Sequence, residues 1–170
     1  MSGFAGIIRL ESGAECAEVD RPLIEQMARA IAFRGPDAVQ QTLQPGAAFA
    51  FSLSNTGPAP QESSQPCTLD GETWFLGDAR CDGREELKRQ LEQLGLQIAD
   101  GATSEHFILG AFSKFGEARL PELHGDFSFA LWNPRQRKIV AYRDLTCRGR
   151  RSRYASLRGA TRPPELPGPQ

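Results

Sequence analysis

The sequence predicts an α+β fold built on antiparallel β-structure, and three observations point to it. Strand-like and helix-like segments are grouped along the chain rather than strictly alternating, which favours antiparallel sheets over a doubly wound parallel sheet. Residues 126–132 alternate apolar and polar side chains, as a half-buried strand does. Helical spacing of apolar residues recurs in the segments 20–35, 84–95 and 104–115, so helices accompany this β-structure.

Composition and charge are those of a compact globular domain. The chain has 170 residues, of which 39% are hydrophobic and 24% charged, enough for a packed core. The formal net charge of −1 creates no overall field for nucleic acid or a membrane surface. No apolar run approaches the ~20 residues of a membrane span, and no secretory leader is indicated. We therefore expect a cytoplasmic protein without a membrane partner.

Cysteine and histidine spacing argues against a metal site. The residues concerned are Cys16, Cys67, Cys81, Cys147, His106 and His124. No two cysteines are spaced as Cys-x-x-Cys, and the histidines stand apart in sequence, so no metal site is expected. His106 is interpreted as a packed surface residue of a helix. Reduced thiols are the simplest assignment for the cysteines.

The first segments are predicted to form a strand followed by a helix. Residues 4–10 are an apolar run, and Gly6 allows close backbone approach, which suits a buried strand. Asp20 is a good helix N-cap, and Pro22 suits the first helical turn. The Gly35-Pro36 pair then ends the helix.

The middle of the chain contains two further strands and two helices. Residues 48–53 and the region around 73–76 are predicted strands, separated by a Pro- and Ser-rich surface loop at 55–66. Helices are predicted at 84–95 and 104–115, because apolar residues recur there at helical spacing. The apolar face of the first helix consists of Leu87, Leu91 and Leu94, and Gly95 closes it.

A hairpin is predicted next, and the amino-acid composition of the chain changes after it. Phe127, Phe129 and Leu131 share one strand face, Asn133-Pro134 begins a turn, and residues 137–144 form the partner strand. Residues 145–170 are rich in Arg and Pro and lack apolar periodicity. This tail is expected to be disordered or loosely attached. A truncation or a shifted reading frame after Asp144 would explain the change.

Five segments, taken in order, carry a family resemblance. They are SGFAGI (Ser2–Ile7), RGPD (Arg34–Asp37), GDARCDGREEL (Gly77–Leu87), TSEHFILGAFSKFG (Thr103–Gly116) and LHGDFSFALWNPRQRKIVAYRD (Leu123–Asp144). Their order and spacing resemble the N-terminal glutaminase-type domain of the asparagine synthetase family, the class II glutamine amidotransferases. The resemblance covers residues 1–144, which we take as one domain, with the tail at 145–170.

The resemblance implies both a fold and a mechanism. The fold is of the N-terminal-nucleophile type, a four-layer sandwich of two antiparallel sheets flanked by helices. In the mechanism Met1 is removed, the side chain of residue 2 attacks the amide of glutamine, and the α-amine of residue 2 acts as the base. Ammonia then passes to a synthetase domain or subunit. ATP and Mg are expected only for that domain, and no cofactor is expected for this chain.

Several positions of this sequence depart from the family pattern. Ser2 stands at the position of the cysteine nucleophile. Ser52, or a neighbour, stands at the position of the arginine that holds the glutamine carboxylate, and no Arg or Lys lies between Ala48 and Asn55. Asp78, Ala79 and Arg80 stand where the family has Asn-Gly-Glu, which supplies the oxyanion donor and the acid for the substrate amine. An ionised Asp78 accepts hydrogen bonds but donates none. Ser104 stands at the later family aspartate, with Glu105 adjacent.

These departures predict a catalytically degenerate glutaminase-like domain that serves as a structural partner of a synthetase domain. Ser2 is then the remnant of a nucleophile, and Arg34, Gly35, Pro36 and Asp37 are structural, with Asp37 bonding its own backbone. The GDAR turn is similar to the branch that contains lasso-peptide and β-lactam-forming cyclases. Two alternatives stay open: an active amidohydrolase that uses Ser2, and RNA binding through the Arg-rich tail, which the rest of the chain does not favour.

Overall fold

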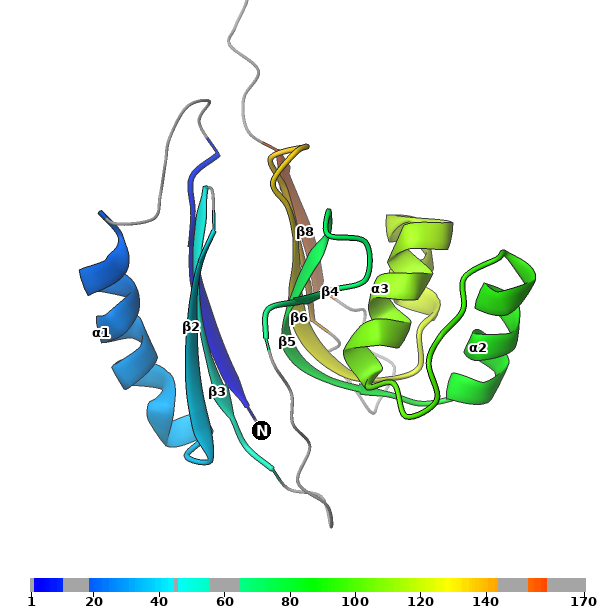
Figure 1. Cartoon of the computed structure of the whole chain (residues 1–170), viewed down its shortest axis with the longest axis horizontal. Coiled ribbons are helices and arrows are strands. Elements are labelled where there is room, and N and C mark those ends of the chain that lie inside the picture. Colours follow the sequence, from blue (N-terminus) through cyan, green and yellow to red (C-terminus); the bar gives the residue numbers. More distant parts are fainter. Residues whose placement is uncertain (1, 11–18, 45, 56–64, 144–152, 159–170) are drawn as a thin grey trace, which may run out of the picture.

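The computed structural model describes residues 2–10, 19–44, 46–55 and 65–143, together with the backbone of 153–158. Within these residues the predicted α+β class is confirmed, because the chain forms two antiparallel sheets with helices packed outside them (Figure 1). One sheet has three strands and the other has five.

The smaller sheet has the strand order β1-β3-β2. Its strands are β1 (Gly3–Ile8), β2 (Ala38–Gln44) and β3 (Ala47–Leu53). The central strand β3 pairs Ser52 with Gly3 of β1, and it pairs the same residue with Val39 of β2. Helix α1 (Arg21–Ile31) covers one face of this sheet and continues into the short helix η1 (Ala32–Arg34).

The larger sheet has the strand order β4-β5-β6-β7-β8. Its strands are β4 (Cys67–Thr68), β5 (Trp74–Cys81), β6 (Gly125–Asn133), β7 (Lys138–Arg143) and β8 (Arg153–Arg158). Its helices are α2 (Arg84–Gln93), α3 (Ser104–Phe115) and the short η2 (Glu117–Glu122). Because β5 pairs with β6 over its whole length, two segments far apart in sequence lie side by side in this sheet.

Four layers are visible in Figure 1, in the order α1, small sheet, large sheet, and α2 with α3. Each of the three contacts between layers has its own buried apolar cluster. Ile24 and Ala28 of α1 pack on Ala48 and Ala50 of β3. The cluster between the two sheets is formed by Ala47, Phe49, Phe51, Leu76 and Trp132. The largest cluster joins the outer face of the large sheet to α2, α3 and η2.

The elements with the strongest periodic patterns were predicted well. Helix α3 has the predicted limits, α2 ends with Gly95 at a positive φ of 77°, and β6 buries Phe127, Phe129 and Leu131 as expected. Leu94, however, is 48% exposed and does not belong to the buried face of α2. Asp20 makes no side-chain cap on α1; its carboxylate accepts hydrogen bonds from the guanidinium of Arg9 at 2.7 and 3.4 Å.

Part of the Arg-rich tail differs from the expectation. Residues 153–158 form β8, which pairs antiparallel with β7 from Arg143↔Arg153 to Lys138↔Arg158. The physical reason is that β7 would otherwise present a row of unpaired backbone groups, which any extended segment can complete. The remaining tail, at 144–152 and 159–170, lies outside the described residues, and so does most of the predicted loop, at 56–64.

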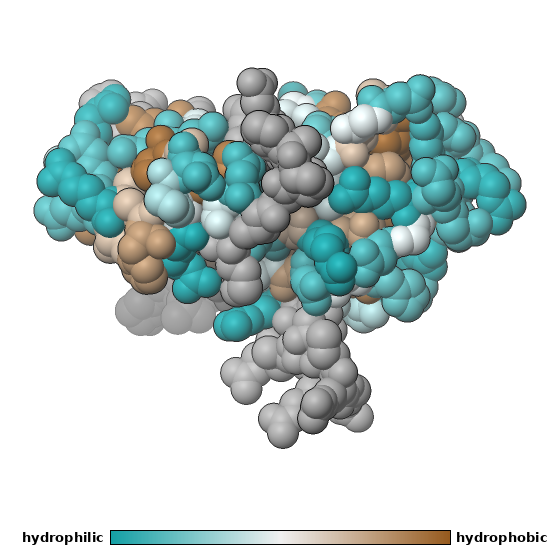
Figure 2. All heavy atoms as spheres, turned by 90° about the horizontal axis from the view of Figure 1, so that it is seen from below, coloured by the Kyte–Doolittle hydropathy of each residue, from teal (hydrophilic) through white to brown (hydrophobic). Residues whose placement is uncertain are grey.

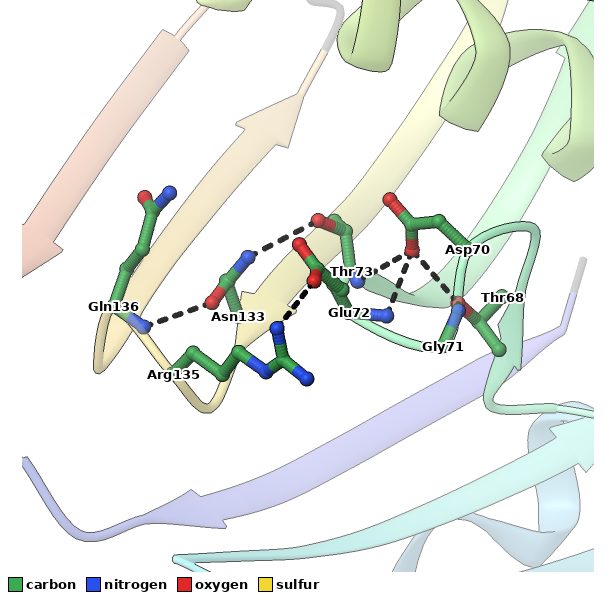
Figure 3. Close-up of polar contacts among 8 residues, drawn as sticks. All are labelled: Thr68, Asp70, Gly71, Glu72, Thr73, Asn133, Arg135 and Gln136. Atoms are coloured by element: carbon green, nitrogen blue, oxygen red, sulfur yellow. Dashed lines mark hydrogen bonds and ion pairs between the residues drawn. The ribbon is translucent and has the colours of Figure 1, made fainter.

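Two turns of the large sheet are joined by polar contacts, shown in Figure 3. Asp70, in the turn between β4 and β5, accepts hydrogen bonds from the backbone N–H groups of Glu72 and Thr73, both at 2.8 Å. Glu72 then pairs with Arg135 at 2.6 Å, in the turn between β6 and β7. Although partial burial opposes the effect, these N–H donors and the Thr68 hydroxyl lower the pKa of Asp70.

Replacing Asp70 with alanine is expected to lower the free energy of unfolding at neutral pH by about 1 kcal/mol, because two backbone donors lose their acceptor. A lowered carboxyl pKa contributes stability above its unfolded value of about 4, and this contribution is lost as pH falls through the folded value. The loss should therefore disappear under acidic conditions. Urea unfolding of both chains at neutral and at acidic pH measures the difference in the free energy of unfolding. Asp70→Asn, which keeps an acceptor oxygen, should lose less; an equal loss at both pH values contradicts the explanation.

Candidate functional site

Ser2 lies at the start of β1, where the two sheets meet. The pairing of Gly3 with Ser52 fixes the backbone beside it. The Ser2 hydroxyl oxygen accepts a hydrogen bond from the Ser54 backbone N–H at 3.2 Å, and the Ser2 backbone N–H donates to Oδ2 of Asp78 at 3.1 Å. Ser2 is only 7% exposed. Two residues that the sequence singled out, Ser2 and Asp78, are therefore in direct contact.

Asp78 reaches Ser2 because of the alternation of side chains along β5. Leu76, two residues earlier, belongs to the cluster between the sheets, so Asp78 points to the same side. Burial raises the pKa of Asp78, and the nearby Glu105 carboxylate raises it further. The α-ammonium group of the chain, the Ser2 N–H and the Arg34 guanidinium lower the pKa but do not cancel the rise. Asp78 is thus a half-buried carboxyl that retains its proton more readily than an exposed one.

Ser52 is fully buried and faces the protein backbone. Its hydroxyl lies 3.0 Å from the Ile31 carbonyl oxygen and 3.3 Å from the Gly3 carbonyl oxygen, and it donates to these acceptors. A Cβ added at Gly3 would meet the Ser52 hydroxyl at 2.8 Å and the Arg34 side chain at 3.0 Å. The space around Ser52 is therefore filled by the chain itself.

The other two residues of the GDAR turn lie away from Ser2. Ala79 packs against the cluster on the helix side of the large sheet, as alternation requires. Arg80 forms ion pairs with Asp126 at 2.9 Å and Asp82 at 3.3 Å, and its side chain is 63% exposed. Neither residue contributes to the contact between Ser2 and Asp78.

At the start of α3, it is Glu105 that lies near Asp78. The Ser104 hydroxyl accepts hydrogen bonds from the Cys81 backbone N–H at 3.0 Å and from Arg84 at 2.7 Å, so it ties α3 to the end of β5. Glu105, which is 8% exposed, accepts a hydrogen bond from Gln65 at 3.2 Å. The adjacent position noted in the sequence is therefore the one that faces the site.

Gln65 is a site residue that sequence reasoning placed in a surface loop, yet it is only 4% exposed. Its side-chain amide pairs with both backbone groups of Gly77: Nε2 donates to the carbonyl at 2.8 Å, and Oε1 accepts from the N–H at 2.7 Å. Nε2 also reaches Glu105. The local signal is only a glutamine before Pro66, and nothing in a Pro- and Ser-rich context marks it as buried.

The RGPD segment packs against the end of β3, and the hydrogen bond of Asp37 differs from the prediction. The Asp37 carboxylate accepts a hydrogen bond from the Asn55 N–H at 2.7 Å, not from its own backbone, and its own N–H donates to the Leu53 carbonyl at 3.1 Å. Gly35 lies directly against the backbone of β3. Pro36 is exposed, and so is Arg34, whose guanidinium lowers the pKa of Asp78 together with the α-ammonium group of the chain.

The cysteines and histidines of the described residues form no reactive centre. Burial, with a contribution from Glu105, raises the pKa of the Cys67 thiol to about 12, and burial also raises the pKa of Cys81, so neither provides a thiolate at neutral pH. His106 shares a 3.0 Å contact between Nδ1 and the Thr103 hydroxyl, and His124 is exposed. No group of metal-binding side chains occurs among the described residues. Cys16 and Cys147 lie outside them.

The face seen in Figure 2 is largely hydrophilic at both ends, with hydrophobic residues in small groups. Large apolar side chains with high exposure occur singly at Val19 and Phe33, both 80% exposed. Within the described part of the chain, no helix is long and apolar enough to cross a lipid bilayer.

A family model described as "Glutamine amidotransferase domain" matches residues 1–149. No curated protein matches the chain. Among solved structures, the chain is similar to glutamine phosphoribosylpyrophosphate (PRPP) amidotransferase from B. subtilis, complexed with ADP and GMP, with a TM-score of 0.45 and 16% sequence identity. The match covers 60% of this chain and 24% of that one, so the chain spans about a quarter of the length of the protein it resembles.

Proposed function

The chain belongs to the family of glutamine amidotransferase domains, and from this premise we propose that it is a glutaminase-type domain with a degenerate active site. It adopts the N-terminal-nucleophile arrangement, with Ser2 at the nucleophile position. Its role is that of a structural partner to an ATP-dependent synthetase domain of the asparagine synthetase type. ATP and Mg act in that partner and not on the residues described here.

The contact between Asp78 and Ser2 is the observation that carries this proposal. Amide hydrolysis at Ser2 would develop negative charge on the substrate oxygen, which needs a nearby hydrogen-bond donor. Here a carboxyl group, with Glu105 behind it, lies 3.1 Å from the nitrogen of the residue that would attack. Two acidic side chains beside a developing oxyanion destabilise it rather than stabilise it.

The hydroxyl groups at two other family positions also support degeneracy. A substrate carboxylate is usually held by an arginine that makes paired charge-assisted hydrogen bonds. Ser52 stands at that position and is fully buried. Its short side chain is already hydrogen-bonded to a backbone carbonyl and does not reach toward a ligand. Ser104 is bound by Cys81 and Arg84. Both residues stabilise the fold at positions where the family binds glutamine.

The parent context follows from the turn in β5. The sequence GDAR stands in place of the family's Asn-Gly-Glu. This replacement is similar to the turn of the lasso-peptide and β-lactam-forming branch of the asparagine synthetase family. In that branch the glutaminase-like domain accompanies a synthetase domain that forms an amide bond without ammonia from glutamine. A synthetase domain is accordingly the partner we assign.

Glutamine should not be hydrolysed at Ser2. A chain that begins at Ser2, incubated with glutamine, is expected to release ammonia no faster than the Ser2→Ala chain does, because the oxyanion lacks a donor and the carboxylate lacks its arginine. A coupled assay of ammonia and glutamate measures this. Ser2→Cys tests whether a better nucleophile alone restores activity, and it should not.

The second candidate, an active amidohydrolase, is favoured by one observation. The Ser2 hydroxyl accepts its hydrogen bond from Ser54, which leaves the hydroxyl proton available for removal. Ammonia release that disappears in Ser2→Ala establishes this candidate and overturns the degenerate one. RNA binding through the Arg-rich tail concerns residues that lie mostly outside the described part of the chain.

A further inference from the structure

We propose that Asp78 binds the α-ammonium group of Ser2 in a chain from which Met1 has been removed. The resulting ion pair ties the first residue of the small sheet to β5 of the large sheet. The inference rests on the proposed function, since it assigns a task to the same two residues, and it explains why the processed terminus does not act as a base.

The position of the Ser2 nitrogen is determined by its neighbours. The Gly3↔Ser52 pair holds the backbone that follows, and the Ser54 N–H holds the Ser2 side chain at 3.2 Å. The nitrogen lies 3.1 Å from Oδ2 of Asp78, at hydrogen-bond distance. None of these contacts involves Met1, so the geometry is retained when the chain begins at Ser2.

The charges around Asp78 favour a cation at this nitrogen. Three charged groups act on Asp78 of β5: the α-ammonium group of the chain and Arg34 of η1 lower its pKa, and Glu105 of α3 raises it. Of the two cations, the α-ammonium group acts more strongly on Asp78 than Arg34, which is an exposed residue. A neutral amide N–H at Ser2 compensates Asp78 only in part. An ammonium group at the Ser2 nitrogen places the positive charge of the terminus at hydrogen-bond distance from Asp78.

Removal of Met1 provides that ammonium group. An aminopeptidase adds one water molecule across the Met1–Ser2 peptide bond, which releases methionine and leaves a primary amine on Ser2. Because folded Ser2 is only 7% exposed, this cleavage belongs to the nascent chain. The free amine has an ordinary pKa of about 7.7–8.0, and a carboxylate at hydrogen-bond distance stabilises its charged form.

The ion pair has two consequences. A protonated amine cannot accept the proton of the Ser2 hydroxyl, so Asp78 withholds the base that the nucleophile needs. The pair also stabilises the fold. Since the folded amine has a raised pKa, its contribution is fully present below the unfolded value of about 8 and is lost as pH rises through the folded value.

The experiment uses the full chain released from an amino-terminal fusion so that it begins at Ser2, with serine carrying ¹³C and ¹⁵N. NMR titration of Ser2 is expected to give an α-amine pKa about one unit or more above the ordinary value. Asp78→Asn should return the pKa to the ordinary range. Asp126→Asn, which removes an exposed carboxyl group from β6, should leave it raised. An ordinary or lowered pKa in the unsubstituted chain, or an undiminished rise in Asp78→Asn, overturns the proposal.

A comparison without substitutions keeps the test independent of how well Asp78→Asn folds. Chains that begin at Met1 and at Ser2 are released from the same fusion and unfolded in urea across a pH range. The Ser2 chain is expected to be the more stable below pH about 8 and to lose this advantage at higher pH. Equal stability at every pH refutes the ion pair. Ser2-dependent ammonia release with a raised amine pKa refutes only the degenerate function, so the two failures are distinguishable.

Discussion

Replacing Trp132 with alanine is expected to lower the free energy of unfolding by about 3–5 kcal/mol. Trp132 lies on β6, is 2% exposed, and belongs to the cluster with Phe49, Phe51 and Leu76 that joins the two sheets. These neighbours lie on β3 and β5, which backbone pairing holds in place, so they cannot close the cavity that the indole leaves.

Urea unfolding of Trp132→Ala measures this loss, and Phe33→Ala is the matched control. Phe33 is also a large aromatic residue but is 80% exposed, so its truncation should cost no more than about 0.5 kcal/mol. Trp132→Phe should recover much of the stability, because the indole N–H has no hydrogen-bond partner among the described residues and phenylalanine brings no such group. Similar losses for Trp132→Ala and Phe33→Ala would falsify the assignment of the core.

Gly35→Ala is expected to be the second severe change, with a loss of about 3 kcal/mol or more, because the new methyl group has no room. A Cβ at this position would lie 2.3 Å from the Ser52 carbonyl oxygen, 2.4 Å from its carbonyl carbon and 2.5 Å from that of Leu53. These are backbone atoms of the central strand β3, which cannot move without disturbing its pairing with β1 and β2.

The control for Gly35→Ala is Gly95→Ala. Gly95 has a φ of 77° and nothing within 4 Å of its added Cβ, so that variant tests only the cost of the left-handed conformation, about 1 kcal/mol. Thermal unfolding of both variants separates the cost of the steric clash at position 35 from the cost of the left-handed conformation at position 95. If Gly35→Ala is no less stable than Gly95→Ala, η1 and β3 do not pack as closely as described.

The fold was predicted best where a local pattern repeats several times. Helix α3 and strand β6 carry long runs of apolar residues at periods of 3.6 and 2, so even their limits were close. Strand β2 was missed because its sequence, AVQQTLQ, contains three glutamines and offers little alternation at the edge of a sheet. Strand β8 was missed because its pairing with β7 depends on an open sheet edge, which a local pattern does not reveal.

The site was predicted in part, for a similar reason. The resemblance singled out Ser2 and Asp78, which are 76 residues apart in sequence, and the structure brings them into contact. It did not single out Gln65, whose burial depends on hydrogen bonds to the backbone groups of Gly77 rather than on any neighbour in sequence. Asp37 was expected to bond locally but reaches Asn55. Long-range polar pairs of this kind have no periodic signature.

The Gln65 side chain gives Gly77 an unusual kind of protection. In most sheets, the exchange of a strand amide with solvent requires two backbones to separate. Strand β4 is too short to pair with Gly77. The amide proton of Gly77 is hydrogen-bonded instead to the Gln65 side chain, which can rotate about its single bonds. Solvent can therefore reach this proton by rotation of one glutamine, while β5 and β6 stay paired. Strand β5 thus contains, on the side that β4 leaves uncovered, an amide whose exchange reports side-chain motion beside Ser2 and Asp78 rather than unfolding.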